Sequence, residues 1–173
     1  ANLDEQRVEL EIPGVSLIEI DTGTEIILEK LVRKPLKEIN RAGLLGEVKQ
    51  RVNNEVSLKT LHGKVNNSLR DHEKIKNDYR LETPHGVAGV RGTSFSCEAN
   101  PGTTECSVLE GEVEFSSSDD PSMTRTLTAG IRATFGSALS EPDTASGLTE
   151  NQKKELQETK NQVQGKNRLL QTP

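Results

Sequence analysis

The fold is decided by the stretch Thr83-Pro84-His85-Gly86-Val87-Ala88-Gly89-Val90-Arg91-Gly92-Thr93-Ser94-Phe95. After Thr83-Pro84, small, β-branched and aromatic residues are interspersed with glycines. β-Branched and aromatic residues favour strands, and a glycine within a strand pattern marks a tight bend or the close approach of another backbone. The stretch therefore predicts a mainly β fold, in which strands run from Tyr79 to about Phe135.

Glycines and phenylalanines recur at regular intervals in and beyond this stretch. Three glycines are 19 residues apart and three phenylalanines are 20 apart: Gly92, Gly111 and Gly130; Phe95, Phe115 and Phe135. A period near 20 is typical of one coil of a β-solenoid, whereas regularly spaced strands of a sandwich give similar intervals. We therefore expect a short-strand, solenoid-like domain, with a sandwich-like domain as the alternative.

The N-terminal part predicts strands followed by a change of character. Within residues 8–32, β-branched and apolar runs stand between turns at Pro13-Gly14 and residues 21–24, which is typical of short strands. In residues 34–54 the apolar positions recur at helical spacing; they are Leu45, Val48 and Val52. We expect a short helix at about residues 34–54, inserted between strands.

The C-terminal part predicts a helix behind a linker. Residues 137–148 are rich in Ser, Pro, Asp and Gly, which is typical of a linker. Thr149 opens a Thr-Glu-Asn-Gln capping box, in which the Gln152 side chain can reach back to the cap. The expected organisation is a β domain over residues 1–136, a linker over 137–148 and a helical tail over 149–173.

Two cysteines flank a predicted hairpin turn. Cys97 and Cys106 stand on either side of Asn100-Pro101-Gly102-Thr103, and a central Pro-Gly pair fits a type II turn. If the turn joins antiparallel strands, the numbers of paired residues sum to 203, so that Cys97 lies directly opposite Cys106. We expect a disulfide and hence an oxidising compartment; the alternative is two reduced thiols on adjacent strands.

Composition and charge exclude some classes of function. The 173 residues carry a net charge of −5, which argues against broad nucleic-acid binding, and we expect no nucleic-acid partner. No apolar run approaches the roughly 18 residues of a membrane span, so the chain as given is not expected to span a membrane. Ala1 is followed at once by polar residues, as expected of a chain from which a signal peptide is absent.

No pattern in the sequence predicts catalysis. There is no nucleophile-elbow motif, phosphate loop or dinucleotide fingerprint. Asp71-His72-Glu73 lies in a polar run and is expected to be solvated rather than to bind a metal. Glu110, Glu112 and Glu114 are expected to share a solvated strand face, since apolar residues alternate with them. We therefore expect a protein that is not an enzyme and has no catalytic residues, no cofactor and no metal.

An ordered set of motifs resembles the FecR domain family. Thr83-Pro84 and residues 88–93 are similar to its Thr-Pro and Ala-Val-Arg-Gly-Thr-type segments, with Gly89 inserted. Residues 108–113 are similar to its Val-Leu-Glu-Gly-x-Val segment, and Ala129-Gly130 to its closing Ala-Gly. The motif residues, which we expect to be structural, are Thr83, Pro84, Ala88, Gly89, Val90, Arg91, Gly92, Thr93, Leu109 and Gly111. For Arg91 an anion clamp is the alternative to a structural role.

The resemblance also implies a location and a function. FecR domains are β-rich, and the resemblance implies a periplasmic, secreted or cell-surface location. In iron-uptake signalling, FecR regulators receive a protein signal from an outer-membrane transporter and pass it to a sigma factor. We expect an extracytoplasmic, non-enzymatic binding or scaffolding protein that engages a protein or a cell-envelope polymer. The alternative is a signal-sensing regulatory subunit of a FecR-type transmembrane signalling system.

Overall fold

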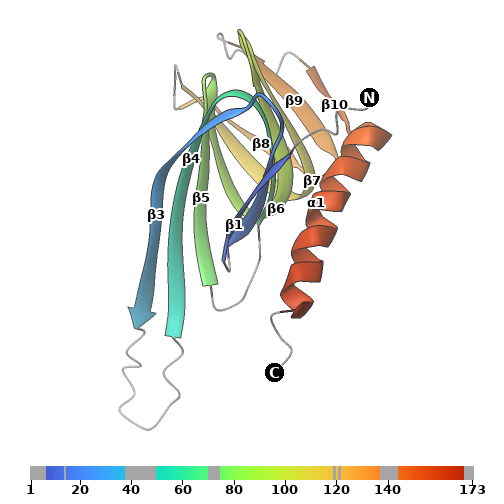
Figure 1. The fold of residues 1–173 in the computed structure, drawn as a ribbon. Coiled ribbons are helices and arrows are strands. Elements are labelled where there is room, and N and C mark those ends of the chain that lie inside the picture. Colours follow the sequence, from blue (N-terminus) through green and yellow to red (C-terminus); the bar gives the residue numbers. More distant parts are fainter. Residues whose placement is uncertain are drawn as a thin grey trace.

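The described part of the chain forms mostly strands, followed by one helix (Figure 1). The computed structural model describes residues 7–13, 15–37, 50–69, 75–118, 120, 122–136 and 144–169. The elements are β1 (Val8–Ile12), β2 (Ser16–Ile20), β3 (Glu25–Lys37), β4 (Gln50–Leu69), β5 (Ile75–Thr83), β6 (Gly86–Asn100), β7 (Thr103–Ser117), β8 (Thr124–Thr128), β9 (Ile131–Gly136), β10 (Thr144–Gly147) and α1 (Glu150–Leu169). The predicted mainly β class and the predicted C-terminal helix are confirmed.

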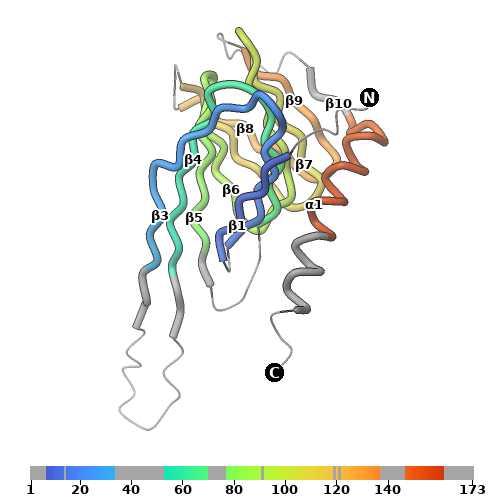
Figure 2. Tube along the Cα trace, in the orientation of Figure 1, coloured from blue at the N-terminus to red at the C-terminus, as the bar shows by residue number. Residues whose placement is uncertain are grey.

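The strands form one continuous sheet folded into two layers, because three long strands belong to both. Layer A contains β3, β5, β8, the first halves of β4 and β6, and the second half of β7. Layer B contains β1, β2, β9, β10 and the other halves of the same three strands. Described neighbours pair antiparallel, except β4 with β5. Figure 2 shows β3 beside β4, with α1 on the opposite side of the molecule.

Glycines stand where the long strands pass from one layer to the other. Gly63 in β4, Gly92 in β6 and Gly111 in β7 have φ values of 90°, 57° and 82°, which residues with a side chain rarely adopt. A Cβ atom at Gly63 would lie 2.4 Å from Thr24 Oγ1, so the neighbouring chain also leaves no room for one. Gly130 occupies the turn between β8 in layer A and β9 in layer B. Gly92, Gly111 and Gly130 mark one crease along which the sheet folds, whereas Gly63 pairs with Ala99 and marks a second bend at the other end of the layer-B strands.

The crease explains the 19-residue repeat without a solenoid. Gly92 and Gly111 lie side by side on the antiparallel strands β6 and β7, where the register shifts between Arg91 and Ser94. Equal intervals between glycines therefore reflect strands of similar length that all bend at one line. The solenoid-like arrangement is not confirmed: the strands form one sheet-rich, barrel-like fold, in which shared strands join the two layers at both bends.

The core lies between the two layers and follows the alternation of the strands. Val56, Leu81, Val113 and other inward residues of layer A meet inward residues of layer B. The Phe115 and Phe135 rings, one from each layer, stack with centroids 3.9 Å apart. Tyr79 of layer A donates a hydrogen bond to Asn67 Oδ1 of layer B at 2.5 Å, and burial raises the pKa of its hydroxyl. With so few aromatic residues, such pairs across the layers fix how the layers face each other.

The predicted helix over residues 34–54 is wrong at both ends. Residues 34–37 belong to β3 and residues 50–54 to β4, and the two strands pair as far as Lys37 and Gln50. Pro35 disfavours a helix interior, and β-branched Val52 continues an alternating strand pattern into Val56. Residues 38–49, which include Leu45 and Val48, lie outside the described residues.

The predicted linker is likewise partly a strand. Residues 144–147 form β10, which pairs with residues 131–134 of β9, and Leu148 is buried behind it. Backbone pairing fixes these small residues although their composition is typical of a linker, while residues 137–143 lie outside the described residues. The capping box is present: Gln152 N donates to Thr149 Oγ1 at 3.3 Å and Thr149 N to Gln152 Oε1 at 3.0 Å.

Candidate functional site

Helix α1 covers the outer face of layer B. Alternation along β2 turns Leu17 and Glu19 away from the core, and both are buried. From the helix, Leu156 and Thr159 are buried against this face, and Thr159 Oγ1 donates to Glu19 Oε2 at 2.6 Å. Much of the covered face is polar, with Asn66 and Ser107 among the buried residues. Among the described residues, Leu17 of the sheet and Leu156 of the helix therefore supply most of the hydrophobic attraction between the helix and this face.

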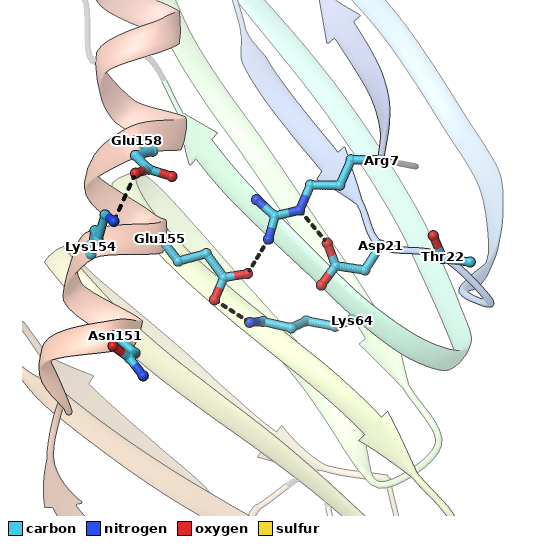
Figure 3. A pocket seen from close by; sticks show the side chains of 8 residues that line it. All are labelled: Arg7, Asp21, Thr22, Lys64, Asn151, Lys154, Glu155 and Glu158. Carbon is cyan, nitrogen blue, oxygen red and sulfur yellow. Dashed lines mark hydrogen bonds and ion pairs between the residues drawn. The ribbon is translucent and has the colours of Figure 1, made fainter. Parts of the chain in front are cut away.

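A network of charged side chains joins α1 to the edge of layer B (Figure 3). Arg7 Nε lies 3.1 Å from Asp21 Oδ1, and Arg7 Nη2 lies 3.1 Å from Glu155 Oε1. Lys64 Nζ lies 2.5 Å from Glu155 Oε2, and Asn66 Nδ2 donates to Glu155 Oε1 at 3.2 Å. Glu155 thus accepts from three side chains, one from the residue just before β1 and two from β4. It is the main polar anchor of the helix.

The environment of Glu155 holds its carboxylate in the charged form. Burial raises its pKa, but the hydrogen bond and charge of Lys64, the hydrogen bond of Asn66 and the charge of Arg7 together lower it. The net result is a pKa below the ordinary value of 4.5. The contact is therefore present at neutral pH and weakens on acidification.

The same residues line a cleft of about 630 Å³ between α1 and the sheet. Its lining residues are Arg7, Asp21, Thr22, Lys64, Asn151, Lys154, Glu155 and Glu158. Figure 3 shows Lys154 and Glu158 at the helix side, where their charged atoms lie 4.0 Å apart. Both signs of charge are present and apolar side chains are few. Such a lining suits a charged protein surface better than a small apolar ligand.

A second, shallower hollow lies on the outer face of layer A. Glu112 and Glu114 are exposed there, as the sequence predicted, beside Gly89 and Thr126. Glu110 is also exposed and forms an ion pair with Lys160 of α1 at 2.7 Å. These carboxylates lie on an open sheet face, which gives them no enclosed site for acid–base chemistry.

The FecR-like motif residues lie at the β5–β6 turn, in the core and at the crease. Thr83 Oγ1 donates to Gly86 O at 2.9 Å across the turn that contains Pro84, and Thr93 Oγ1 donates to Glu112 O at 3.0 Å. Ala88 and Val90 are buried in the core. Gly92 and Gly111 bend the strands, Gly89 faces outward and Leu109 is half-buried. The Arg91 side chain lies outside the described residues, so its role stays a prediction.

Cys97 and Cys106 lie opposite each other, at the register that the sequence predicted. The pairs of the hairpin run from Phe95 with Val108 to Asn100 with Thr103, so Cys97 is opposite Cys106. Their Cα atoms are 4.3 Å apart, their sulfur atoms are bonded, and both residues are buried in the core. Gly102 has a φ of 85°, as a type II turn requires.

The charged network was not predicted from the sequence. Arg7, Asp21, Lys64 and Glu155 are far apart in the chain, and only the fold brings them together. The one local signal is the position of Glu155 beside Leu156 in a helix with few apolar residues. Nothing in the sequence indicates which part of the sheet that helix covers.

The described part of the chain holds neither a cluster of metal ligands nor a helix that could span a membrane. Within it, no three His, Cys, Asp or Glu side chains gather as a metal site would require. Asp71-His72-Glu73 lies outside the described residues, so the absence of a metal there stays a prediction. No helix in the described ranges is both long enough and apolar enough to cross a membrane.

The fold is similar to that of two crystal structures of a protein from Parabacteroides distasonis ATCC 8503, described as a "putative anti-sigma factor". Each shows a TM-score of 0.52 and 16% sequence identity, over 83% of this chain and 56% of the other. This chain thus spans little more than half the length of those proteins, and at this identity the similarity shows the fold alone. No curated protein matches the chain.

The sequence also matches a protein family. Residues 3–114 match the family described as FecR protein, and this range covers more than half of the 173 residues. It contains β1–β6 and most of β7, and hence the β5–β6 turn, the disulfide hairpin, Gly63 and the crease glycines Gly92 and Gly111. On this match, the chain belongs to the FecR protein family.

Proposed function

We propose that this chain is the partner-binding β domain of a FecR-type signalling regulator. The observation that carries the proposal is the family match over residues 3–114. The fold similarity to a protein described as an anti-sigma factor supports it. From the sequence, a non-signalling scaffold was the main hypothesis and signalling was the alternative. The comparisons favour the signalling role, and no contact in the described structure favours the scaffold specifically.

The cleft between α1 and layer B is the surface at which we place the partner. The side chains of its ion pairs remain 20–31% exposed, so a second charged surface can reach Arg7 and Lys64. A protein with a charged surface can therefore bind at Lys154 and Glu158 and compete for Arg7 and Lys64. Binding there would loosen or tighten α1, which gives the domain a way to pass on a signal. A cell-envelope polymer is the alternative partner.

We place the domain outside the cytoplasm. The Cys97–Cys106 disulfide persists in an oxidising compartment, and cytosolic thiols are normally kept reduced. The family membership supports the same location. We propose the periplasm or the cell surface, and a protein partner in that compartment.

The signalling role is tested by transcription in the source organism. The gene is deleted and then restored with either the wild-type sequence or a Lys154→Glu variant. If the chain belongs to a regulator, deletion changes the expression of a small set of genes, and the wild type restores it. An unchanged transcript profile under every condition in which the gene is expressed would overturn the signalling role.

The cleft is tested by direct capture of the partner. Lys154→Glu reverses a charge in the cleft, whereas Lys153→Glu reverses a neighbouring charge on α1 that does not line the cleft. Wild type and Lys153→Glu should capture the same protein from envelope extract, identified by mass spectrometry, and Lys154→Glu should lose it. Equal capture by all three forms would exclude this cleft as the binding surface.

A further inference from the structure

Strand β3 lies at the rim of layer A, on the far side of the molecule from α1 (Figure 2). Among the described strands it pairs with β4 alone, so its other edge offers backbone groups to a further strand. It also carries three exposed apolar residues: Ile27, Leu28 and Leu31 are 45%, 45% and 53% exposed. An exposed apolar edge of this length is a site for strand addition.

A register shift places two of these residues on the core side. Leu28 pairs with Leu58, and Leu31 pairs with Val56, although only two residues separate Leu28 from Leu31. The extra residue is Glu29, which lies at the irregularity between Leu28 and Lys30. Since Leu58 and Val56 face the core, Leu28 and Leu31 extend the core layer beyond the rim and are incompletely covered there.

The charges of β3 are separated along its length. Glu25 and Glu29 lie in the first part of the strand, and Lys30 and Arg33 lie in the second. A parallel copy of the strand would place like charges together, whereas an antiparallel copy places acidic residues against basic ones. The strand is therefore complementary to itself in the antiparallel direction.

We propose that β3 pairs antiparallel with β3 of a second copy of this chain, across a two-fold axis between Glu29 and Lys30. In that register Glu29 lies opposite Lys30 of the second copy, and Leu28 lies opposite its Leu31. The shift at Glu29 puts Leu28 and Leu31 on one face, so four leucines join the two cores across the axis. The interface is isologous, as a closed dimer requires. This inference does not depend on the signalling role.

Contacts within one copy do not prevent this pairing. Lys30 Nζ lies 2.6 Å from Glu55 Oε2, and Ser57 Oγ donates to Glu29 Oε2 at 3.1 Å. Lys30 is half exposed, and exposed contacts of this type are weak. Their side chains can therefore turn toward a second copy without loss of the fold.

The dimer is tested by the mass of the full chain in solution across a concentration series, measured by analytical ultracentrifugation. Wild type should shift from monomer to dimer, and Leu31→Lys should remain a monomer with an unchanged circular dichroism spectrum. The matched control is Met123→Lys, which replaces an exposed apolar residue away from β3 and should dimerise as wild type. A wild type that is monomeric at its highest soluble concentration, or a Leu31→Lys protein that still dimerises, would overturn the proposal.

The register is tested by charge exchange. Glu29→Lys and Lys30→Glu each place like charges opposite each other at two symmetry-related positions, which should weaken the homodimer roughly tenfold. Mixing the two variants restores opposite charges at both positions, so the mixture should form a heterodimer of near wild-type affinity. The double variant Glu29→Lys/Lys30→Glu should also regain wild-type affinity. If the two mixed variants associate no more tightly than each variant does alone, the two-fold axis does not lie at this position.

Discussion

At Gly111 the backbone has a φ of 82°, and a Cβ atom there would lie 2.8 Å from Thr93 Oγ1 and 3.0 Å from Gly92 O. Gly111→Ala therefore combines a strained backbone with a close contact to the neighbouring strand at the crease. We expect a loss of about 2–3 kcal/mol in the free energy of unfolding, measured by chemical denaturation.

Two other glycines provide controls for this prediction. Gly102→Ala keeps the strain of a positive φ but meets open space, so it should cost less. Gly89→Ala places its Cβ 3.7 Å from Glu114 O, an ordinary contact, and should change the stability least. Equal stability of the Gly111→Ala and Gly89→Ala proteins would show that the crease does not require glycine.

Glu155 gives the attachment of α1 a pH dependence. Its pKa is lowered in the folded protein, so its contribution to stability is present above the unfolded value of about 4.5 and is lost as the pH falls through the folded pKa. Glu155→Gln should therefore be less stable than wild type at pH 7, with a difference that shrinks below about pH 4.5. Free energies of unfolding measured for both proteins between about pH 3 and 7 test this. A difference independent of pH would mean that charge is not what holds the helix.

At the scale of elements, the hairpin of β6 and β7 is closed by its disulfide. The sequence separation of 9 residues corresponds to a contribution of about 2–3 kcal/mol in the chain-entropy account. We expect the Cys97→Ala/Cys106→Ala protein to fold with a stability lower by about that amount. Intact mass after alkylation should show two modified thiols in the wild type only when a reductant is added. Alkylation of both thiols without reductant would contradict the disulfide.

Among the described side chains of helix α1, Leu156 makes the one large apolar contact with layer B. Leu156 is 1% exposed, whereas the adjacent Gln157 is exposed. Leu156→Ala should release residues 150–161 of the helix from layer B, because the other described contacts of this part are polar and exchange with water, at a cost of about 2–5 kcal/mol for the docked state. Hydrogen exchange of residues 150–161 should become fast while the core strands stay protected, and Gln157→Ala should leave both unchanged. Unaltered protection of α1 in the Leu156→Ala protein would show that the polar network alone holds the helix.

At the scale of the whole molecule, features set by neighbouring residues were the predictable ones. The hairpin register at Pro101-Gly102 and the Thr149–Gln152 cap each depend on a few adjacent residues, and both were confirmed. The exchange of strands between layers was not predictable, because a glycine repeat has the same spacing at a solenoid corner and at a crease. The cleft was missed for a related reason: Lys64 and Glu155 are 91 residues apart and meet only after the sheet and helix have formed.

The sharing of β4, β6 and β7 between the two layers has a mechanical consequence. A force applied to the rim of layer A is transmitted through the continuous backbones of these strands into layer B, which lies beneath α1. It does not have to pass through a non-covalent interface between the layers. The two halves cannot separate as independent bodies, so melting should be a single cooperative transition with calorimetric and van't Hoff enthalpies in agreement.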